Sequence, residues 1–331
     1  MFATCTSVII PNWNGLKHLP RCLESLATQT FQDFEIIIVD NGSTDGSLDY
    51  LKENWPDVRL IESGENKGFA AANNIGAREA QGEWLALLNA DAFPEPDWLK
   101  TLIEATQKYP EFSFFGSRLI QANNPNLLDG TGDVYHISGL AWRRDYNLPV
   151  RDSGGEVEEI FSPCAAAALY RRDVFLEVGG FDEDFVSYHE DVDLGFRLRL
   201  QGHRALYVPE AIVKHIGSST LGKQSNTQVY YGHRNLVWSF FQNMPGFLVW
   251  KYLPAHILAN LIFLIHYSMR GQAKAIFQSK WDALKGLPKA LSKRRNIQKS
   301  RRVKPSEISC MMEHGWLKPY FLGFRARQKS K

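Results

Sequence analysis

The sequence has few cysteines, and they are widely separated. Only four occur among the 331 residues, and no Cys-x-x-Cys pair is found in the set Cys5, Cys22, Cys164 and Cys310. This spacing argues against a cysteine zinc site and a disulfide framework, and it is typical of a protein in a reducing cytosol. The N-terminus also lacks the pattern of a secretory signal, because the first expected strand, residues 7–10, begins almost at once. We therefore expect a cytoplasmic protein.

The glycine-rich signature of dinucleotide-binding proteins is also missing. In such proteins a Gly-x-Gly-x-x-Gly turn follows the first strand and lets the backbone approach the pyrophosphate. Here that position holds Pro11-Asn12-Trp13-Asn14-Gly15. The sequence therefore does not predict a dehydrogenase.

Net charge is small, but it is unevenly distributed. The formal net charge is +2, yet the chain from Arg270 onward carries 17 Lys and Arg against 3 Asp and Glu. The part before it carries 21 basic and 33 acidic residues. A basic tail on an acidic body indicates a polyanionic surface as partner. Because no nucleic-acid recognition module accompanies the tail, we expect a membrane surface and not a nucleic acid.

The first half of the chain alternates between short apolar runs and helical patterns. Runs of strand length occupy residues 8–11, 35–40, 59–62 and 84–88, and apolar residues at helical spacing mark residues 16–28 and 69–80. A further helix is expected around Tyr50 and Leu51. This alternation predicts an α/β fold with a doubly wound, mostly parallel sheet. The length allows one large or two small domains.

Two acids, Asp40 and Asp91, directly follow buried strands. Ligands of open α/β sheets bind beyond the carboxyl ends of the strands. Asp91 is therefore a candidate ligand for a divalent cation. Asp40, beside a Gly/Ser/Thr-rich turn, is a candidate acceptor of hydrogen bonds from a nucleobase or ribose. The alternative is that such acids only order their turns, and Asp45 in particular could cap the next helix.

Residues 65–74 open a helix with glycine, amides and a lysine. The free N–H groups of a helix N-terminus attract phosphate, which makes Asn66 and Gly68 candidates for contact with a phosphate group. The alternative is a tight helix start whose alanines pack on the sheet.

The second half is less regular. Residues 130–155 are rich in Gly, Asp and Arg and predict a mobile loop near a site, while residues 161–170 predict another strand or a buried small-residue segment. Glu190 and Asp191 begin a helix that runs to Leu200. A carboxylate at the start of this helix could act as a general base, or it could simply be stabilised by the helix dipole. After a strand at residues 205–209, His215 lies in an expected loop at residues 213–219, as a structural histidine or a second ligand to the cation at Asp91.

Taken together, these stretches resemble the family-two inverting glycosyltransferases with the GT-A fold, especially bacterial rhamnosyltransferase-like members. The resemblance rests on residues 8–14, residues 38–47, Leu88-Asn89-Ala90-Asp91 and His189-Glu190-Asp191, with support from residues 66–73. Their order and spacing span residues 7–220, about two thirds of the chain.

The resemblance implies a role for each matching residue. Pro11, Asn14 and Asp40 would line the nucleotide pocket, with Asp40 on the base. Asp91 and His215 would bind a divalent cation, Mg²⁺ or Mn²⁺, that bridges the donor's diphosphate. Asp191 would be the catalytic base, with Glu190 beside it. The other implied nucleotide-sugar-binding residues are Asn41, Asp45, Asn66, Gly68, Asn73, Asn89 and Ala90.

One position departs from the family pattern. The usual Asp-x-Asp is Asn89-Ala90-Asp91 here. Since an amide can hydrogen-bond a ribose or a metal-bound water but carries no charge, strict metal dependence stays an open question.

The domain division follows from these patterns. We expect a catalytic domain at residues 1–235, with a nucleotide-sugar half to about residue 125 and an acceptor half from residue 126, and a helical, basic region at residues 236–331. Residues 247–269 are apolar enough to span a membrane, but Pro254, His256, Asn260 and His266 interrupt them. We expect an interfacial or re-entrant helix, with Lys293-Arg294-Arg295 and Arg301-Arg302 on anionic headgroups; the alternative is a buried core helix.

The leading hypothesis is an inverting glycosyltransferase peripheral to the inner face of the plasma membrane. It would move a sugar, with rhamnose as a candidate, from a nucleotide-diphosphate donor to a lipid-linked saccharide acceptor in cell-surface polysaccharide synthesis. The alternatives are a nucleotidyltransferase on a similar sheet and a non-catalytic nucleotide-sugar-binding scaffold at the membrane. The leading hypothesis requires Asp40, Asp91 and Asp191 to surround one cleft, with His215 nearby.

Overall fold

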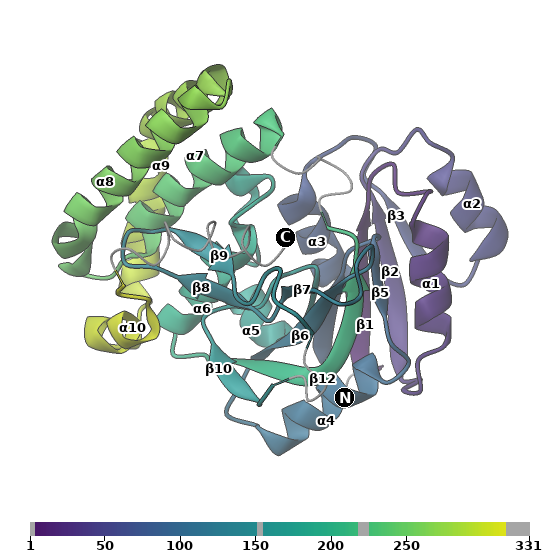
Figure 1. Cartoon of the computed structure of the whole chain (residues 1–331). Coiled ribbons are helices and arrows are strands. Elements are labelled where there is room, and N and C mark those ends of the chain that lie inside the picture. The colour runs from purple at the N-terminus through teal and green to yellow at the C-terminus, as the bar shows by residue number, and fades with distance from the viewer. Residues whose placement is uncertain (1–3, 151–154, 218–224, 316–331) are drawn as a thin grey trace.

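The computed structural model describes residues 4–150, 155–217 and 225–315 (Figure 1). Its strands are Thr6–Asn12 (β1), Phe34–Asp40 (β2), Arg59–Glu62 (β3), Trp84–Leu88 (β4), Ala92–Pro94 (β5), Phe114–Gln121 (β6), Leu128–Gly130 (β7), Asp133–Tyr135 (β8), Ala141–Arg143 (β9), Glu158–Ile160 (β10), Ala167–Arg171 (β11) and Ala205–His215 (β12). The α-helices are Leu19–Ala27 (α1), Ser47–Asn54 (α2), Phe69–Glu79 (α3), Trp98–Lys108 (α4), Arg172–Glu177 (α5), Glu190–Leu200 (α6), Asn226–Asn243 (α7), Leu248–Met269 (α8), Ala273–Lys299 (α9) and Pro305–Met311 (α10). A short 3-10 helix, η1, covers Glu183–Phe185.

The central sheet has the strand order β10-β12-β6-β11-β4-β1-β2-β3. Strands β4, β1, β2 and β3 are parallel, as are β6 and β12. Strand β11 runs antiparallel between these two groups, where it joins β4 to β6. The parallel half is the part that the apolar runs predicted, and its carboxyl ends carry Asn12, Asp40 and Asn89-Ala90-Asp91 toward one edge.

Helices cover both faces of the sheet, which confirms the doubly wound arrangement. On one face, α1 and α4 bury residues that include Leu23, Leu26 and Leu102 against β1 and β4. On the other face the small residues of α3 and the apolar residues of α5 and α6 pack on Ile9, Ile37 and Leu87. Alternate residues of one strand thus face opposite layers, so β1 and β2 are apolar along most of their length.

Two local predictions need correction. Residues 133–143 are not a loop, because β8 and β9 pair as a hairpin there; residues 151–154 of that prediction lie outside the described residues. Residues 161–170 are buried, as expected, and the last four belong to β11. His215 is the last residue of β12 and is not in a loop, since a shift of register between Val208 and Ile212 lets the strand continue beyond residue 209; residues 218 and 219 also lie outside the described residues.

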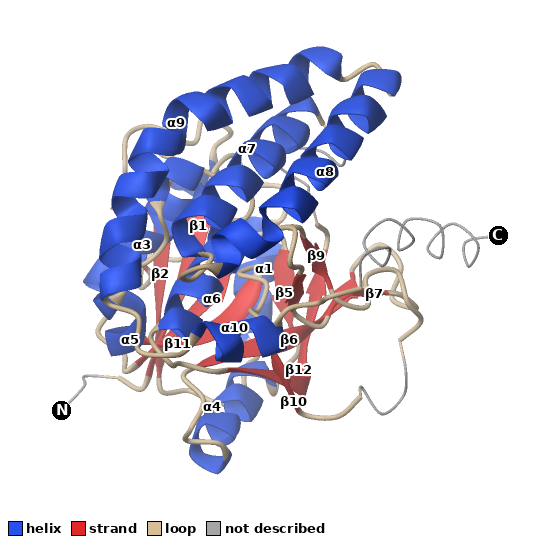
Figure 2. Ribbon diagram, turned by 90° about the vertical axis from the view of Figure 1, so that its left-hand side faces the viewer, coloured by secondary structure: helices blue, strands red, loops and turns tan. Residues whose placement is uncertain are grey.

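The C-terminal helices α7, α8 and α9 lie together beside the sheet, and α7 crosses the expected domain boundary at residue 235 (Figures 1 and 2). Residues of α7, α8 and α10 form an apolar core with the β8 and α6 side chains Tyr135 and Phe196. Helix α8 is long and apolar enough to cross a membrane by length and composition, but a third of its most apolar window is buried in the protein.

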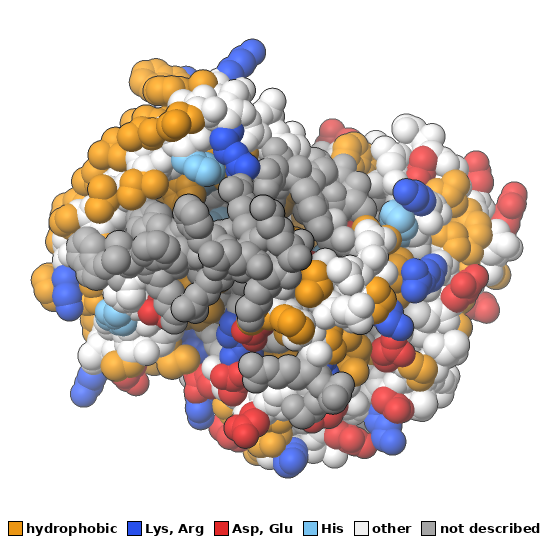
Figure 3. Space-filling view, in the orientation of Figure 1, with side chains coloured by type: hydrophobic (Ala, Val, Ile, Leu, Met, Phe, Trp, Pro, Cys, Tyr) orange, Lys and Arg blue, Asp and Glu red, His pale blue; other side chains and the backbone are white. Residues whose placement is uncertain are grey.

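The outward face of α8 and α9 is apolar. Trp250, Trp281 and Met269 are 70%, 61% and 83% exposed, and other large exposed side chains of these helices are Ile257, Leu258, Leu261, Ile265, Phe277, Leu284 and Leu291. Figure 3 shows hydrophobic side chains gathered over this part of the molecule. A fully buried core helix would not present such a face, so the expected alternative of a buried core helix is wrong.

The predicted role of Lys293 and Arg294 on lipid headgroups is also wrong. Lys293 forms ion pairs with Asp182 and Asp184. Arg294 donates hydrogen bonds to the carbonyls of Phe241 and Met244. Lys293 therefore binds α9 to the catalytic body, and Arg294 binds it to the C-terminal end of α7.

A pair of glycines tests how closely α7 and α9 are packed. A Cβ added at Gly286 of α9 would lie 2.3 Å from the Trp238 ring of α7, whereas one added at Gly232 would meet nothing within 4 Å. Both Gly→Ala changes gain helix propensity, but only Gly286→Ala overpacks the interface. We expect the free energy of unfolding of Gly286→Ala to be about 1–3 kcal/mol below that of Gly232→Ala in urea titrations; equal values would contradict this packing.

Candidate active site

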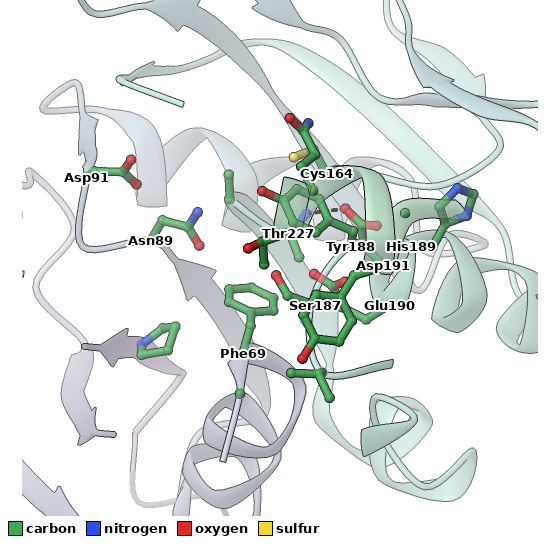
Figure 4. A pocket seen from close by; sticks show the side chains of 18 of the residues that line it. Phe69, Asn89, Asp91, Cys164, Ser187, Tyr188, His189, Glu190, Asp191 and Thr227 are labelled. Carbon is green, nitrogen blue, oxygen red and sulfur yellow. Dashed lines mark hydrogen bonds between the residues drawn. The ribbon is translucent and has the colours of Figure 1, made fainter. Parts of the chain in front are cut away.

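The site is a cavity of about 1250 Å³ between the carboxyl edge of the parallel strands and the C-terminal helices. Figure 4 shows Asn89 and Asp91 on one side and Glu190 and Asp191 on the other. The predicted site residues on its wall are Pro11, Asn14, Asn41, Asn66, Gly68, Asn89, Ala90, Asp91, Glu190, Asp191 and His215. The sheet edge and the start of α6 therefore face one space.

Asp91 and His215 are brought together by backbone pairing. In the ladder between β5 and β12, His215 lies opposite Ala92, the residue after Asp91. The Ile216 N–H also donates to the carbonyl of Asp91 at 3.1 Å. As a result, Nε2 of His215 lies 3.3 Å from Oδ1 of Asp91.

Asp129 orients the His215 ring from the other side. Its Oδ2 lies 2.7 Å from Nδ1 of His215, and both side chains are buried. Burial alone would lower the pKa of His215, but Asp129 and Asp91 together raise it above the ordinary value. The raised pKa favours a protonated ring whose Nε2–H faces Asp91. Because Asp129 accepts from Nδ1–H, loss of the Nε2 proton would leave the Nε2 lone pair available to a cation.

The donor set at this point fits a divalent cation. No group of three or more His, Cys, Asp or Glu side chains within residues 4–150, 155–217 and 225–315 encloses a metal position. The Nε2 atom of His215 is buried and makes no hydrogen bond, however, and it faces a carboxylate. Magnesium-type ions often take one or two protein ligands and complete their shell with substrate phosphates and water. Two ligands are therefore sufficient if a diphosphate supplies the others.

Asn89 holds the turn that presents Asp91. Its N–H donates to the Ala166 carbonyl at 2.9 Å, and its own carbonyl accepts from the Ala92 N–H at 3.0 Å. The side-chain Oδ1 of Asn89 is buried and has no hydrogen-bond partner in the protein. An acceptor of this kind on the cavity wall suits a hydroxyl group or a metal-bound water.

Asp191 lies at the start of α6, on the opposite wall. Its Oδ1 accepts from the Val192 N–H at 2.9 Å, and its Oδ2 accepts from the Ala165 N–H at 3.4 Å. Burial raises the pKa of Asp191, although these N–H groups and Arg143 oppose the shift. The pKa of Glu190 is raised well above its ordinary value by burial and by Asp191. A carboxylate with a raised pKa is a stronger base than a surface aspartate.

The loop before α6 has an unusual backbone, which α7 holds in place. Val186, Tyr188 and His189 have φ values of 65°, 67° and 67°, a left-handed conformation that costs free energy for such residues. The fully buried Asn235 donates from Nδ2 to the carbonyls of Phe185, Ser187 and Tyr188 at 2.8–2.9 Å. One amide on α7 therefore fixes the loop that leads to Asp191.

The nucleotide-side residues form a hydrogen-bonded rim. Asn41 donates to the Asn66 side chain and to the Gly68 carbonyl, each at 3.1 Å. Asn14 accepts from the Thr44 N–H at 2.8 Å. Gly68 allows close approach to the catalytic loop, because an added Cβ would lie 2.8 Å from Cγ1 of Val186.

Asp40, Asp45 and Asn73 are not among the residues of the cavity wall, and their contact with the nucleotide sugar stays a prediction. Asp40 is buried and accepts from Asn12 and from the N–H groups of its own turn. Asp45 accepts from the N–H groups of Leu16 and Ser47 and so caps its turn. Asn73 is buried in α3 and donates to the Phe69 carbonyl. Asp40 and Asp45 therefore hold the turn after β2 in place.

Sequence reasoning missed several residues on the wall, including Lys17, Asp133, Trp142 and Arg143. The last three lie on the β8–β9 hairpin, which was expected to be a loop. The pKa of Asp133 is raised well above its ordinary value by burial and by the nearby Asp191. The Asp and Arg content of residues 130–155 was the one feature of the sequence that pointed to these wall residues. Nothing in the spacing of these residues indicated that a hairpin would place them in the cavity.

Comparison with known proteins gives the family. The model described as "Glycosyl transferase family 2" matches residues 7–179. The N-acetylglucosaminyl-diphospho-decaprenol L-rhamnosyltransferase of Mycobacterium tuberculosis is 29% identical over 251 residues, which are 69% of this chain and 81% of the relative. The O-antigen biosynthesis protein RfbC of Myxococcus xanthus is 32% identical over 224 residues, 65% of this chain but only 17% of that protein.

Solved structures agree on the fold. The crystal structure of GalNAc-T7 with UDP, GalNAc and Mn²⁺ is similar with a TM-score of 0.61 and 19% identity, and covers 76% of this chain and 49% of its own. S. aureus TarS 1–349 has a TM-score of 0.51 at 18% identity, over 72% of this chain and 66% of its own. These neighbours confirm the predicted GT-A type fold. The chain belongs to glycosyl transferase family 2 and is a glycosyltransferase, as its sequence predicted.

Proposed function

We propose that the protein transfers a sugar from a nucleotide-diphosphate donor to a lipid-linked saccharide with inversion at the anomeric carbon. The observation that carries this proposal is the shared cavity of Asp91, His215 and Asp191. Rhamnose is the first donor sugar to test, because a rhamnosyltransferase that acts on a lipid-linked N-acetylglucosamine diphosphate is among the similar proteins. The product would be an intermediate of cell-surface polysaccharide synthesis.

The donor would lie along the carboxyl edge of the parallel strands. Its nucleotide would contact the rim of Pro11, Asn14 and Asn41, and its diphosphate would point toward Asp91 and His215. A divalent cation, Mg²⁺ or Mn²⁺, would there neutralise the charge that builds on the leaving diphosphate. A similar structure was crystallised with UDP and Mn²⁺, which is consistent with such a site. Asn89 would accept a hydrogen bond from the donor.

The acceptor would approach from the opposite wall. Its hydroxyl oxygen attacks the anomeric carbon while the hydroxyl proton passes to a carboxylate oxygen of Asp191. The bond between the anomeric carbon and the diphosphate oxygen breaks, and its electron pair leaves with the nucleoside diphosphate. Glu190 would hold the acceptor or Asp191 in position. Because attack and departure occur on opposite faces of the sugar, one displacement inverts the anomeric configuration.

The C-terminal helices would attach the enzyme to the membrane that contains the acceptor. The exposed apolar face of α8 and α9 includes Trp250 and Trp281, and aromatic rings of this type favour the bilayer interface. The exposed cations Lys251 and Lys285 lie on the same helices, Arg270 directly follows α8, and all three can meet anionic headgroups. We place the enzyme on the inner face of the plasma membrane, with residues 1–235 for catalysis, residues 236–331 for attachment, and α7 shared between them.

Replacement of Asp191 tests the assigned base. Asp191→Asn keeps the size of the side chain but removes its ability to accept a proton, so turnover should fall by about 10²–10⁴-fold. Binding of the nucleotide sugar, followed by calorimetry, should persist. The exposed Asp173 on α5 offers a matched control, and Asp173→Asn should keep full turnover. Near-normal turnover in Asp191→Asn would show that another group accepts the proton.

Replacement of Asp129 tests the cation site without touching its ligands. Asp129→Asn removes the charge that orients His215, so the Mn²⁺ concentration that gives half-maximal turnover should rise by about 10–100-fold. Saturating Mn²⁺ should recover much of the turnover. Asp145→Asn, on the neighbouring loop, is the control and should not change the Mn²⁺ requirement. An unchanged Mn²⁺ titration in Asp129→Asn would exclude this assignment.

The membrane face can be tested with vesicles. Burial of one large apolar side chain contributes about 1.5–3 kcal/mol. The double variant Trp250→Ser, Trp281→Ser should therefore bind phosphatidylglycerol vesicles about tenfold more weakly or worse in sedimentation assays. Tyr146→Ser removes an exposed aromatic residue from the catalytic body and should bind as the wild type does. Equal sedimentation of all three proteins would rule out this face.

A further inference from the structure

The cavity continues beyond the catalytic carboxylates toward the membrane helices. Past His189 its wall is formed by side chains of α7 and α8, among them Tyr231, His233, Phe263 and Tyr267. The His233 ring lies between Phe263 and Tyr267, with ring centroids 4.8 and 4.9 Å away. This extension of the cavity runs from His189 to α8, which carries part of the exposed apolar face.

Two histidines of this extension have polar atoms without a partner. The Nδ1 atoms of His189 and His233 are both buried, and neither has a hydrogen-bond partner in the protein. His233 is 9% exposed and still lines the cavity. Buried polar atoms are nearly always satisfied in folded proteins. Two such atoms at one end of a cavity therefore indicate a ligand that supplies the missing partners.

A lysine places positive charge directly behind these histidines. Nζ of Lys280, on α9, donates to the His233 carbonyl at 2.8 Å. Burial lowers the pKa of Lys280 to about 7. The pKa of His189 is lowered to about 4, and that of His233 well below its ordinary value, by burial and then by Lys280. Burial is the largest cause of each shift, so all three groups are poorly solvated.

The other lysines that α9 turns toward the catalytic body differ from Lys280. Lys289 and Lys293 both form ion pairs with Asp184. Within the described part of the chain, no carboxylate forms an ion pair with Lys280. A partly buried ammonium without a counter-ion is costly unless a ligand provides one. Lys280 is not on the cavity wall, so its charge would act on an anion in the cavity from behind His233.

We propose that His189, His233 and Lys280 form the binding site for the diphosphate that joins the acceptor saccharide to its lipid. This inference rests on the proposed lipid-linked acceptor and adds the subsite that would recognise it. A diphosphate beside His233 directs one end of the acceptor past His189 toward Asp191. It directs the other end along Phe263 and Tyr267 to the apolar face of α8. The rings donate from their nitrogens to the phosphate oxygens, and Lys280 supplies the charge behind them.

The proposed subsite is separate from the position assigned to the donor's diphosphate. Asp91 and His189 lie on opposite sides of the cavity in Figure 4. Occupation of the donor site by a nucleoside diphosphate should therefore leave the acceptor subsite open. This separation gives the experiment a way to tell the two sites apart.

The test measures binding of farnesyl diphosphate by calorimetry in the presence of saturating UDP or dTDP and Mg²⁺. Wild-type protein should bind it, and Lys280→Met and His233→Gln should each bind it about tenfold more weakly or worse. The first change removes the charge behind the rings, and the second removes a ring that donates to the phosphate. Lys274→Met removes an exposed lysine of the same helix and should bind as the wild type does. Circular dichroism spectra and unfolding midpoints identify any variant that fails to fold. If one of the two variants fails to fold, the other still tests the subsite.

Two further probes separate the diphosphate from the lipid chain. Farnesol should bind weakly and equally to all variants, whereas inorganic pyrophosphate should lose affinity in Lys280→Met, as farnesyl diphosphate does. The proposal is overturned if the variants bind farnesyl diphosphate as wild type does, if wild type does not bind it, or if the nucleotide displaces it. In each of these cases Asp191-dependent sugar transfer would still be observed if the proposed function is correct, so the two failures can be told apart.

Discussion

The site depends on the short ladder between β5 and β12. Pairing of His215 with Ala92 brings a histidine from the end of the longest strand next to Asp91, at the end of the central strand β4. Neither residue could hold a cation alone, and residues 92–214 separate them in sequence. The hydrogen bond from Ile216 to the Asp91 carbonyl closes the same corner. A few backbone contacts thus fix the place where, in the proposed function, the donor's diphosphate would be neutralised.

The opposite wall is fixed by a different device. The loop before α6 has a strained, left-handed backbone, and a buried amide on α7 holds it through three of its carbonyls. Because α7 also packs against α8 and α9, the helices proposed to bind the membrane and the loop that positions Asp191 form one structural unit. In the proposed function, attachment to the bilayer and orientation of the base would therefore be linked by rigid packing and need no separate hinge.

Much of the fold could be predicted from the sequence because its information is local. Apolar runs indicate buried strands, and an acid directly after such a run, such as Asp91, can be assigned to the sheet edge without knowing the tertiary structure. Asp129, Asn235 and Lys280 could not be found in this way, since their importance arises from partners 86, 47–50 and 47 residues away. The position of Asp40 after a strand was predicted in the same way, but its hydrogen bonds to Asn12 and to its own turn could not be.

The central claim is that one carboxylate faces the donor across a single cavity, so that transfer occurs in one displacement. The measurement that tests it most directly is the anomeric configuration of the product, read by NMR from the coupling across the new glycosidic linkage. The account predicts a configuration opposite to that of the sugar in the nucleotide donor. A product that retains the donor's configuration would contradict it, because retention requires two displacements or attack on the same face as the leaving group.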